Sequence, residues 1–183
     1  MTDRAIDAGR YIFNGQAAQR VSFVLTTKNK VEFIGKALDE AIQLVGPEDE
    51  LIVVDGASTD GTAEVIDSRR DFIDTFISEP DISCDHAINK GMLVARGKYI
   101  KHLTDDDEFF PEAMEQAITL LENNPQVDVL VCGGMRQLGV DIYPFYIPPG
   151  VNYGKSPEDV FNHGVCGCGF VIRRSSLAVT GLA

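Results

Sequence analysis

The chain has 183 residues and a formal net charge of −12, with 44% hydrophobic and 24% charged residues. These values are ordinary for one globular domain with room for part of a second lobe, and they exclude a disordered chain. The acidic balance argues against a nucleic-acid partner, because phosphate binding depends on clustered lysine and arginine. No run of apolar residues is long enough to cross a membrane.

The first residues and the cysteines indicate the setting of the chain. Residues 1–20 are polar and have no apolar core typical of a secretory signal, so we expect an N-terminal extension.

Cys166 and Cys168 form a C-x-C pair, but the second ligand pair that a structural zinc site needs is missing. The cysteines therefore predict small buried thiols in a reducing compartment, and we expect a cytoplasmic protein.

Strands and helices alternate along most of the chain. Short apolar, β-branched runs predict strands, and apolar residues at helical spacing predict helices. The predicted strands cover 21–27, 51–54, 72–77, 98–103 and 127–132, and the predicted helices cover 31–45, 62–68, 85–95 and 111–124. This alternation implies βαβ units, so the predicted fold class is α/β, with a mainly parallel central sheet flanked by helices.

The alternation stops after Gly133. Residues 139–155 are rich in proline, glycine and tyrosine, and they predict an irregular segment or a β-ribbon. A short helix at 157–161 and a strand at 169–172 are predicted after it. The last third of the chain is therefore expected to depart from the βαβ pattern.

Polar residues gather where three predicted strands end. The first strand runs into residues 26–29, the second into residues 55–58 and the fourth into residues 104–107. Because ligands bind outside the carboxyl ends of strands in parallel sheets, we expect these clusters to surround one polar ligand. Three adjacent carboxylates repel one another unless a cation or hydrogen bonds offset the repulsion. Oxygen-only ligands on a loop favour Mg²⁺ or Mn²⁺, bound together with substrate phosphates.

The aspartate run also has a simpler interpretation. Aspartate-rich turns occur as solvated loops and helix caps, and residues 106–111 precede a predicted helix. The run directly follows a buried strand and stands in register with the other two clusters, which favours ligand binding. Asp60, in contrast, is predicted to cap a helix rather than to bind a ligand, because it stands just before the helix at 62–68. The three histidines are predicted to be structural or solvated rather than catalytic.

Four ordered motifs carry a resemblance to a known family. Residues 21–29 form a strand ending in T-T-K-N, residues 52–62 read I-V-V-D-G-A-S-T-D-G-T, residues 78–91 read S-E-P-D-I-S-C-D-H-A-I-N-K-G, and residues 97–107 read G-K-Y-I-K-H-L-T-D-D-D. They resemble, in order, the P-T-Y-N strand, I-V-V-D-D-G-S-T-D-G-T, the subgroup pattern S-E-x-D-x-G-x-x-D-A-x-N-K-G and G-x-Y-I-x-x-L-x-x-D-D of the inverting family 2 glycosyltransferases. Residues 170–182 are similar to the stretch that precedes the family's acceptor region.

This resemblance implies the GT-A fold and a transferase that moves a sugar from a nucleotide-diphosphate sugar to a saccharide or lipid-linked acceptor, with inversion. Asp55 and the Thr26–Thr27 region would contact the base and ribose, and Lys90 would be a candidate for the donor's phosphates. Asp105 and Asp107 would hold Mg²⁺ or Mn²⁺ as the D-x-D pair, with Asp106 as a further metal candidate. The implied substrate-binding set is Thr26, Thr27, Asn29, Asp55, Ser58, Asp85, Asn89, Lys90, Asp105 and Asp106.

The sequence departs from the family's pattern at three places. Thr104 stands where many members have aspartate, Gly56 replaces the second aspartate of D-D-G-S, and Ile82–Ser83 replaces a glycine-containing turn. Inverting transfer also needs a general base. In the family this base follows the stretch that residues 170–182 resemble, so we expect it beyond Ala183.

We therefore expect a C-terminally truncated GT-A domain over residues 21–183, with the nucleotide-sugar-binding half reaching about residue 134 and the start of an acceptor half after it. The fragment alone is expected to transfer sugar poorly. We expect peripheral association with the inner face of a membrane, through the part of the enzyme that this chain lacks.

Other readings of the motifs lead to different functions. A nucleotidyltransferase would need an N-terminal glycine-rich loop, a receiver domain an acidic pair after the first strand, and a dehydrogenase a G-x-G-x-x-G. Residues 26–30 offer none of these. A non-catalytic nucleotide-sugar-binding domain, or an inactive fragment of such an enzyme, stays as the alternative. The sugar, the nucleotide and the oligomeric state cannot be predicted from this sequence.

Overall fold

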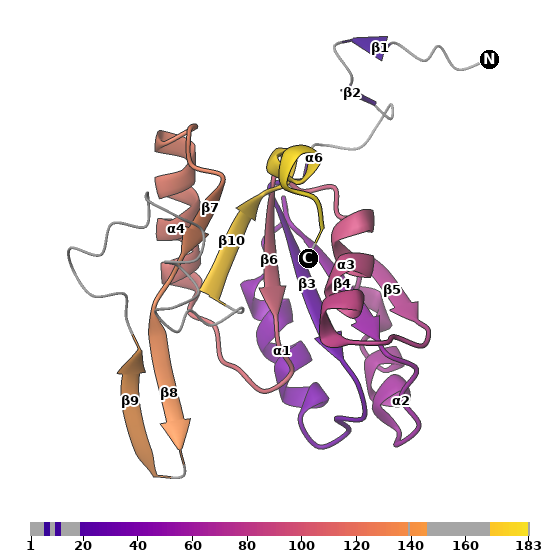
Figure 1. Ribbon diagram of the computed structural model, residues 1–183. Coiled ribbons are helices and arrows are strands. Elements are labelled where there is room, and N and C mark those ends of the chain that lie inside the picture. The colour runs from indigo at the N-terminus through magenta and orange to yellow at the C-terminus, as the bar shows by residue number, and fades with distance from the viewer. Residues whose placement is uncertain (1–5, 8–9, 12–18, 139, 146–168, 183) are drawn as a thin grey trace.

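The computed structural model describes residues 6–7, 10–11, 19–138, 140–145 and 169–182. Its strands are β1 (Ile6–Asp7), β2 (Arg10–Tyr11), β3 (Val21–Thr27), β4 (Glu50–Asp55), β5 (Thr75–Ser78), β6 (Tyr99–Leu103), β7 (Val129–Val131), β8 (Gly134–Leu138), β9 (Asp141–Phe145) and β10 (Phe170–Arg173). Six of them form one sheet in the order β5-β4-β3-β6-β10-β7 (Figure 1). β1 pairs with β2 and β8 with β9 in two small antiparallel ribbons.

The large sheet is mainly parallel, as predicted. β5, β4, β3 and β6 all run in one direction, and β10 runs antiparallel between β6 and β7. All seven residues of β3 are buried, which is typical of a parallel strand covered on both faces. The α/β prediction is therefore confirmed.

The predicted start of the third strand is wrong. Residues Arg70–Phe72 form a 3-10 turn, and the Arg70 guanidinium donates to the carbonyl of Ile73 at 2.7 Å, so β5 begins only at Thr75. The predicted ribbon at 139–155 overlaps the β8–β9 hairpin, which starts earlier, at Gly134. The rest of that range and the predicted helix at 157–161 lie outside the described residues.

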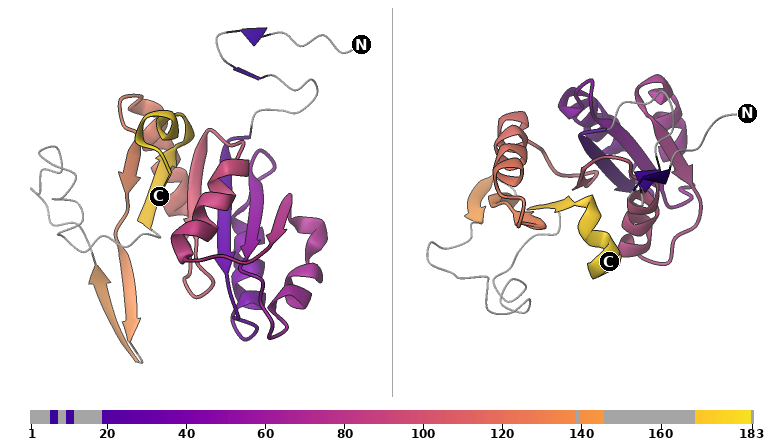
Figure 2. Two further views of the ribbon diagram at one scale, coloured as in Figure 1. Left: turned by 45° about the vertical axis from the view of Figure 1, so that its right-hand side comes forward. Right: turned by 90° about the horizontal axis from the view of Figure 1, so that it is seen from above.

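Helices cover both faces of the sheet (Figure 2). They are α1 (Ile34–Leu44), α2 (Thr62–Asp67), α3 (Cys84–Val94), α4 (Pro111–Asn123) and the short α6 (Leu177–Thr180), which follows a 3-10 turn at Arg174–Ser176. Buried residues of α1, α2 and α4 share one core cluster with the sheet, whereas α3 and α6 pack against the other face. Among the described residues, no helix is both long and apolar enough to span a bilayer.

α1 begins later than the predicted residue 31. Residues 31–33 form a turn in which the Phe33 amide donates to the Lys30 carbonyl at 2.9 Å, and the helix follows at Ile34. This turn matters for the site described below, because the Val31 amide donates to the side chain of Asp60 in the loop after β4.

Glu50 fixes the amino ends of three parallel strands. Its side chain is fully buried at the start of β4 and accepts hydrogen bonds from the Ser22 hydroxyl at 2.5 Å, the Arg96 amide at 2.6 Å and the Arg96 Nε at 2.7 Å. The Gly97 amide also donates to it, at 3.2 Å. A buried carboxylate is tolerated only with such partners. The contact ties β3 and β4 to the turn that leads into β6.

Gly91 sets how closely α3 approaches the sheet. A Cβ at Gly91 would overlap Cγ1 of Val24 in β3, whereas a Cβ at Gly35 in α1 would lie 3.5 Å from the Arg69 guanidinium and 3.7 Å from Val65, which is ordinary contact. Val24 has little freedom to turn away, because a β-branched side chain is stiff at χ1.

We predict opposite effects for alanine at these two helical glycines. Gly91→Ala should lower the free energy of unfolding by about 1–3 kcal/mol through overpacking. Gly35→Ala should raise it by up to about 1 kcal/mol, because alanine favours the helix and finds room there. Urea denaturation of the two variants and the parent chain measures both. Equal effects of the two substitutions would contradict the proposed close packing of α3.

Candidate functional site

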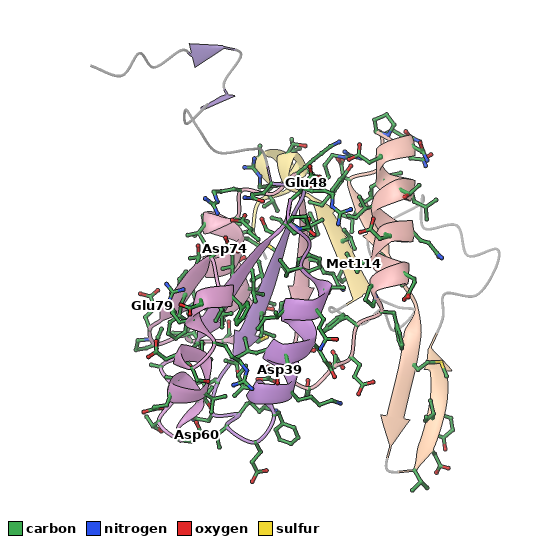
Figure 3. All side chains as sticks on the ribbon, turned by 180° about the vertical axis from the view of Figure 1, so that it is seen from behind. Asp39, Glu48, Asp60, Asp74, Glu79 and Met114 are labelled. Atoms are coloured by element: carbon green, nitrogen blue, oxygen red, sulfur yellow. The ribbon has the colours of Figure 1, made fainter. Side chains whose placement is uncertain are left out.

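The strand register brings the predicted clusters to one edge of the sheet. Thr27 of β3 pairs with Asp55 of β4, Asp55 pairs with Ser78 of β5, and Leu25 of β3 pairs with Leu103 of β6. The loops that follow these four strands therefore leave from the same side. Figure 3 shows Asp60 at this carboxyl edge and Glu48 at the opposite end of the sheet.

Asp55 is an organising residue of this edge. It is fully buried, and its carboxylate accepts from the Ser58 amide at 3.1 Å, from the Ser58 hydroxyl and from the Ser78 hydroxyl at 2.7 Å. Both carboxylate oxygens therefore have donors from within the protein. Asp55 holds the loops after β4 and β5 against each other, and Ser58 is one of its anchors.

Asn29 connects the loops after β3 and β4. Its backbone has a φ of 53°, a conformation that asparagine tolerates better than most residues. The Asn29 amide donates to Ser58 Oγ at 2.7 Å, and its side-chain oxygen accepts from the Thr59 amide at 2.9 Å. The next amide, that of Lys30, donates to Thr62 Oγ1 at 2.8 Å. These bonds fix the two loops in one arrangement.

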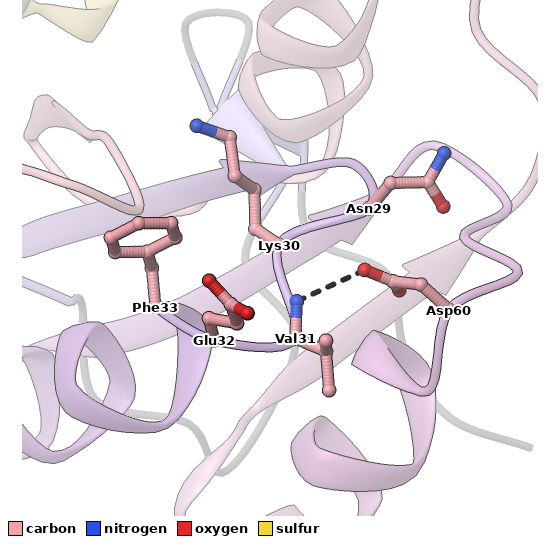
Figure 4. Close-up of a pocket in the computed structure, with 6 residues that line it drawn as sticks. All are labelled: Asn29, Lys30, Val31, Glu32, Phe33 and Asp60. Atoms are coloured by element: carbon pink, nitrogen blue, oxygen red, sulfur yellow. Dashed lines mark hydrogen bonds between the residues drawn. The ribbon is translucent and has the colours of Figure 1, made fainter.

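Asp60 extends the same connection. One of its oxygens accepts from the Val31 amide at 3.1 Å (Figure 4). The other accepts from the Thr62 amide at 3.0 Å. The formal cap of α2 is Gly61, with a φ of 101°, so Asp60 acts one residue earlier than an ordinary cap. A surface pocket of about 210 Å³ lies beside it, lined by Asn29, Lys30, Val31, Glu32, Phe33 and Asp60.

The aspartates after β6 differ in their environments. Asp105 is 8% exposed and accepts from the Thr27 hydroxyl at 2.6 Å; burial raises its pKa, while the bond from Thr27 opposes that change. Asp107 is half-buried and accepts from the Thr104 hydroxyl. Asp106 is exposed, and the Lys30 ammonium lies 3.7 Å from it and 3.8 Å from Asp105.

These residues match only part of a metal site. Among the described residues, no group of three or more histidine, cysteine or acidic side chains is arranged to hold a metal ion. Two loop carboxylates fit Mg²⁺ or Mn²⁺ nevertheless, because these ions take one or two carboxylates and complete their coordination with water and substrate phosphates. The donor set at Asp105 and Asp107 is thus compatible with a cation that binds together with a phosphate ligand.

Thr26 contacts a buried histidine. Thr26 Oγ1 lies 2.9 Å from Nε2 of His102, which is 9% exposed. Burial, helped by the charge of Lys101, lowers the pKa of His102 to about 4. The imidazole is therefore neutral near pH 7.

The amino end of α3 completes the edge. Ser83 caps the helix by accepting from the His86 amide at 3.0 Å, and Cys84 and Asp85 are exposed in the first turn. The prediction of buried thiols is therefore wrong for Cys84. Burial and the negative charges of Asp85, Asp81 and Asp105 raise the pKa of the Cys84 thiol. The Cys84 thiol therefore lies close enough to these carboxylates to be influenced by their charges.

Lys90 is engaged with the loop after β5. Its buried ammonium donates to the carbonyls of Pro80 at 2.7 Å and Glu79 at 3.2 Å, and it lies 3.3 Å from the Glu79 carboxylate. These contacts anchor the loop, so a role toward phosphates would require Lys90 to give them up. Asn89 of the same helix is half-buried.

Sequence reasoning missed Asp81. A Cβ at Gly56 would overlap Oδ2 of Asp81, and Oδ1 of Asp81 lies 3.3 Å from the Lys28 ammonium. Two signals were present in the sequence: Asp81 matches the aspartate of the S-E-x-D pattern, and Gly56 lacks a side chain where the family has aspartate. Nothing in the sequence alone showed that the carboxylate of Asp81 fills that space.

Comparison with known sequences identifies the family. The profile of "Glycosyl transferase family 2" matches residues 22–180. The chain belongs to this family. An uncharacterized glycosyltransferase of Rickettsia prowazekii is 28% identical over 141 residues, which is 76% of this chain and 44% of that protein. A poly-beta-1,6-N-acetyl-D-glucosamine synthase of Staphylococcus epidermidis is 28% identical over 114 residues, covering 61% of this chain and 28% of that enzyme.

Solved structures support the GT-A fold. S. aureus TarS in complex with UDP-GlcNAc superposes with a TM-score of 0.69 at 19% identity, covering 88% of this chain and 47% of that one. A mannosyltransferase from Pyrobaculum calidifontis in complex with GDP-Man and Mn²⁺ gives a TM-score of 0.65 at 21% identity, covering 91% and 48%. The family 2 chain thus spans about half the length of these two solved structures and 44% of the Rickettsia prowazekii relative, and its predicted fold is confirmed.

We predict that His102 makes the fold sensitive to acid. The unfolded chain takes up a proton on this imidazole near pH 6.5, whereas the folded protein resists protonation until about pH 4. Stability should therefore fall between these two values, by up to about 3 kcal/mol. His102→Gln should lose this part of the acid sensitivity, and the surface variant His86→Gln should keep it. Urea denaturation near pH 7 and near pH 4 tests this, and equal losses in both variants would contradict it.

Proposed function

We propose that the protein transfers a sugar from a nucleotide-diphosphate sugar to a saccharide or lipid-linked acceptor, with inversion and with the help of Mg²⁺ or Mn²⁺. The observation that carries the proposal is the alignment of Asp55, Thr27 and Asp105 at the carboxyl edge of one parallel sheet. Membership of glycosyl transferase family 2 supports it. Structural neighbours that hold UDP-GlcNAc or GDP-Man with Mn²⁺ support the class of donor.

The chain's own residues would position the donor. The Thr27 hydroxyl orients the Asp105 carboxylate, and the Thr104 hydroxyl does the same for Asp107. A cation bound by these two aspartates would stabilise the negative charge that develops on the departing nucleotide. Lys30 places a positive charge beside Asp105 and Asp106, which reduces their repulsion of a diphosphate.

The proposed transfer exchanges one bond at the anomeric carbon. The acceptor oxygen attacks this carbon as the bond to the diphosphate oxygen breaks, and the acceptor's proton passes to a general base. We assign no general base to the described residues. We propose that residues up to about 134 form the donor half and that the chain after them begins the acceptor half. We also propose that the protein works in the cytoplasm. A lipid-linked acceptor would bring it to a membrane surface.

Nucleotide binding should depend on the cation and on the D-x-D pair. We predict that one of UDP, GDP and dTDP binds in the presence of Mn²⁺, and that Asp105→Asn and Asp107→Asn each weaken this binding roughly tenfold or more, because a charged ligand to the cation is lost. Calorimetric titration measures the affinity. Asp67→Asn, an exposed position in α2, serves as the control and should bind like the parent chain.

The outcomes separate the proposed function from its alternative. Binding that needs Mn²⁺ and both aspartates, together with sugar transfer by the protein, supports the transferase. Binding of the same kind without transfer to any saccharide or lipid-linked acceptor would favour a nucleotide-sugar-binding domain. Absence of binding to all three nucleotides would overturn the proposed donor site.

Cys84 offers an independent test of where the nucleotide lies. Its thiol is exposed and near Asp81, Asp85 and Asp105. We predict that a bound nucleotide with Mn²⁺, at about ten times its Kd, slows alkylation of Cys84 roughly tenfold by covering it. Peptide mass spectrometry follows the reaction with iodoacetamide. Cys132, at the end of β7, should react at an unchanged rate, and equal protection of both thiols would point to a general stiffening instead.

A further inference from the structure

The carboxylate of Asp81 occupies the space of a missing side chain at the candidate donor site. Asp81 follows β5, and Gly56 follows the neighbouring strand β4. A Cβ at Gly56 would overlap Oδ2 of Asp81 and would lie 3.0 Å from Cδ of Lys28. The side chain of Asp81 is only 9% exposed, so the carboxylate is held in this space rather than extended into solvent.

Gly56 serves this arrangement through its lack of a side chain. The residues with φ in the left-handed region are Asn29, Ala57, Gly61 and Gly181 among those described, and Gly56 is not one of them. Its backbone could therefore carry any L-residue without strain. The amide of Gly56 donates to the Thr27 carbonyl at 2.9 Å, which keeps its Cα at the carboxyl edge. The absence of a side chain at position 56 leaves space, and the carboxylate of Asp81 occupies that space.

Asp81 and Asp55 differ in the acceptor capacity that they offer a ligand. Asp55 is fully buried, and its two oxygens accept from Ser58 and Ser78. Within the described residues, the carboxylate of Asp81 has a single polar partner, the Lys28 ammonium 3.3 Å from Oδ1. A carboxylate accepts about four hydrogen bonds. Asp81 therefore retains acceptor positions at the edge of the sheet that Asp55 has already filled.

The position of Asp81 along the carboxyl edge determines which part of the donor it would contact. The strand order β5-β4-β3-β6 separates the loop of Asp81 from that of Asp105 by three strand spacings, which is roughly 14 Å. With the diphosphate over Asp105, an extended nucleotide along the edge places its nucleoside over β4 and β5. The nucleoside offers ribose hydroxyls and base N–H groups, which are donors that suit a carboxylate.

We propose that Asp81, paired with Lys28 and seated against Gly56, is the carboxylate that accepts hydrogen bonds from the nucleoside of the donor, while Asp55 organises the loops around it. This inference rests on the proposed function. It assigns nucleoside recognition to the loop after β5 and phosphate binding to the loop after β6.

The test separates the two ends of the ligand. Calorimetry with Mn²⁺ compares the nucleoside diphosphate that binds the parent chain with inorganic pyrophosphate, which lacks the nucleoside. Asp81→Asn should weaken binding of the nucleoside diphosphate roughly tenfold to a hundredfold, the effect of a lost charge-assisted hydrogen bond, and should leave pyrophosphate binding unchanged. Asp71→Asn, an exposed acid on the 3-10 turn before β5, is the matched control and should bind both ligands like the parent chain.

Moving the carboxylate provides a second, reciprocal test. Gly56→Asp alone should lose affinity because its side chain collides with Asp81, and Asp81→Gly alone should lose affinity because no carboxylate remains. The double variant Gly56→Asp/Asp81→Gly places one carboxylate in the same space from the neighbouring strand. Its affinity for the nucleoside diphosphate should recover to within about fivefold of the parent chain, and its thermal midpoint should exceed that of Gly56→Asp.

Each result has one meaning. Nucleoside diphosphate binding by Asp81→Asn at the parent affinity would overturn the role of Asp81 and leave the proposed function standing. Equal loss of nucleoside diphosphate and pyrophosphate binding, with a lowered thermal midpoint, would show a structural role for Asp81 and would also overturn the inference. A parent chain that binds no nucleoside diphosphate would overturn the proposed function and this inference together.

Discussion

The parallel register of β3 with both β4 and β6 is the constraint on which the candidate site depends. Glu50 secures it from the far end of the sheet, where one buried carboxylate accepts from Ser22, Arg96 and Gly97. Because a strand advances by a fixed rise per residue, alignment at the amino ends also aligns the carboxyl ends. A residue far from any ligand thereby determines which side chains meet at the opposite edge.

At that edge, hydroxyl groups hold the carboxylates in place. Thr27 donates to Asp105, Thr104 donates to Asp107, and Ser58 and Ser78 donate to Asp55. Such bonds restrict the carboxylates to set directions before any ligand arrives, which lowers the reorganisation that binding would require. The same bonds stabilise negative charge in a chain whose net charge is already −12. These neutral hydroxyl donors thus stabilise part of the carboxylates' negative charge, and a bound cation would stabilise the rest.

The sequence predicted what local pattern controls and missed what long-range packing controls. Buried β-branched runs such as 21–27 located the strands, and the rule that parallel strands end at one edge brought Thr27, Asp55 and Asp105 together. The place of β10 between β6 and β7 could not be predicted, because it pairs Val171 with both Lys101 and Leu130, which lie far apart in the sequence. The engagement of Lys90 with Glu79 and the seat of Asp81 against Gly56 depend on how loops pack, which no periodicity encodes.

The antiparallel insertion of β10 imposes an order on chain synthesis. All four parallel strands and the aspartates after β6 lie within the first 107 residues, whereas β10 starts at Phe170. A nascent chain can therefore assemble its candidate ligand-binding edge while β6 still presents an unpaired flank. Such a flank can recruit strands from other molecules. Slow elongation through the intervening residues would prolong that exposure, so the yield of native protein should be limited by aggregation at this stage.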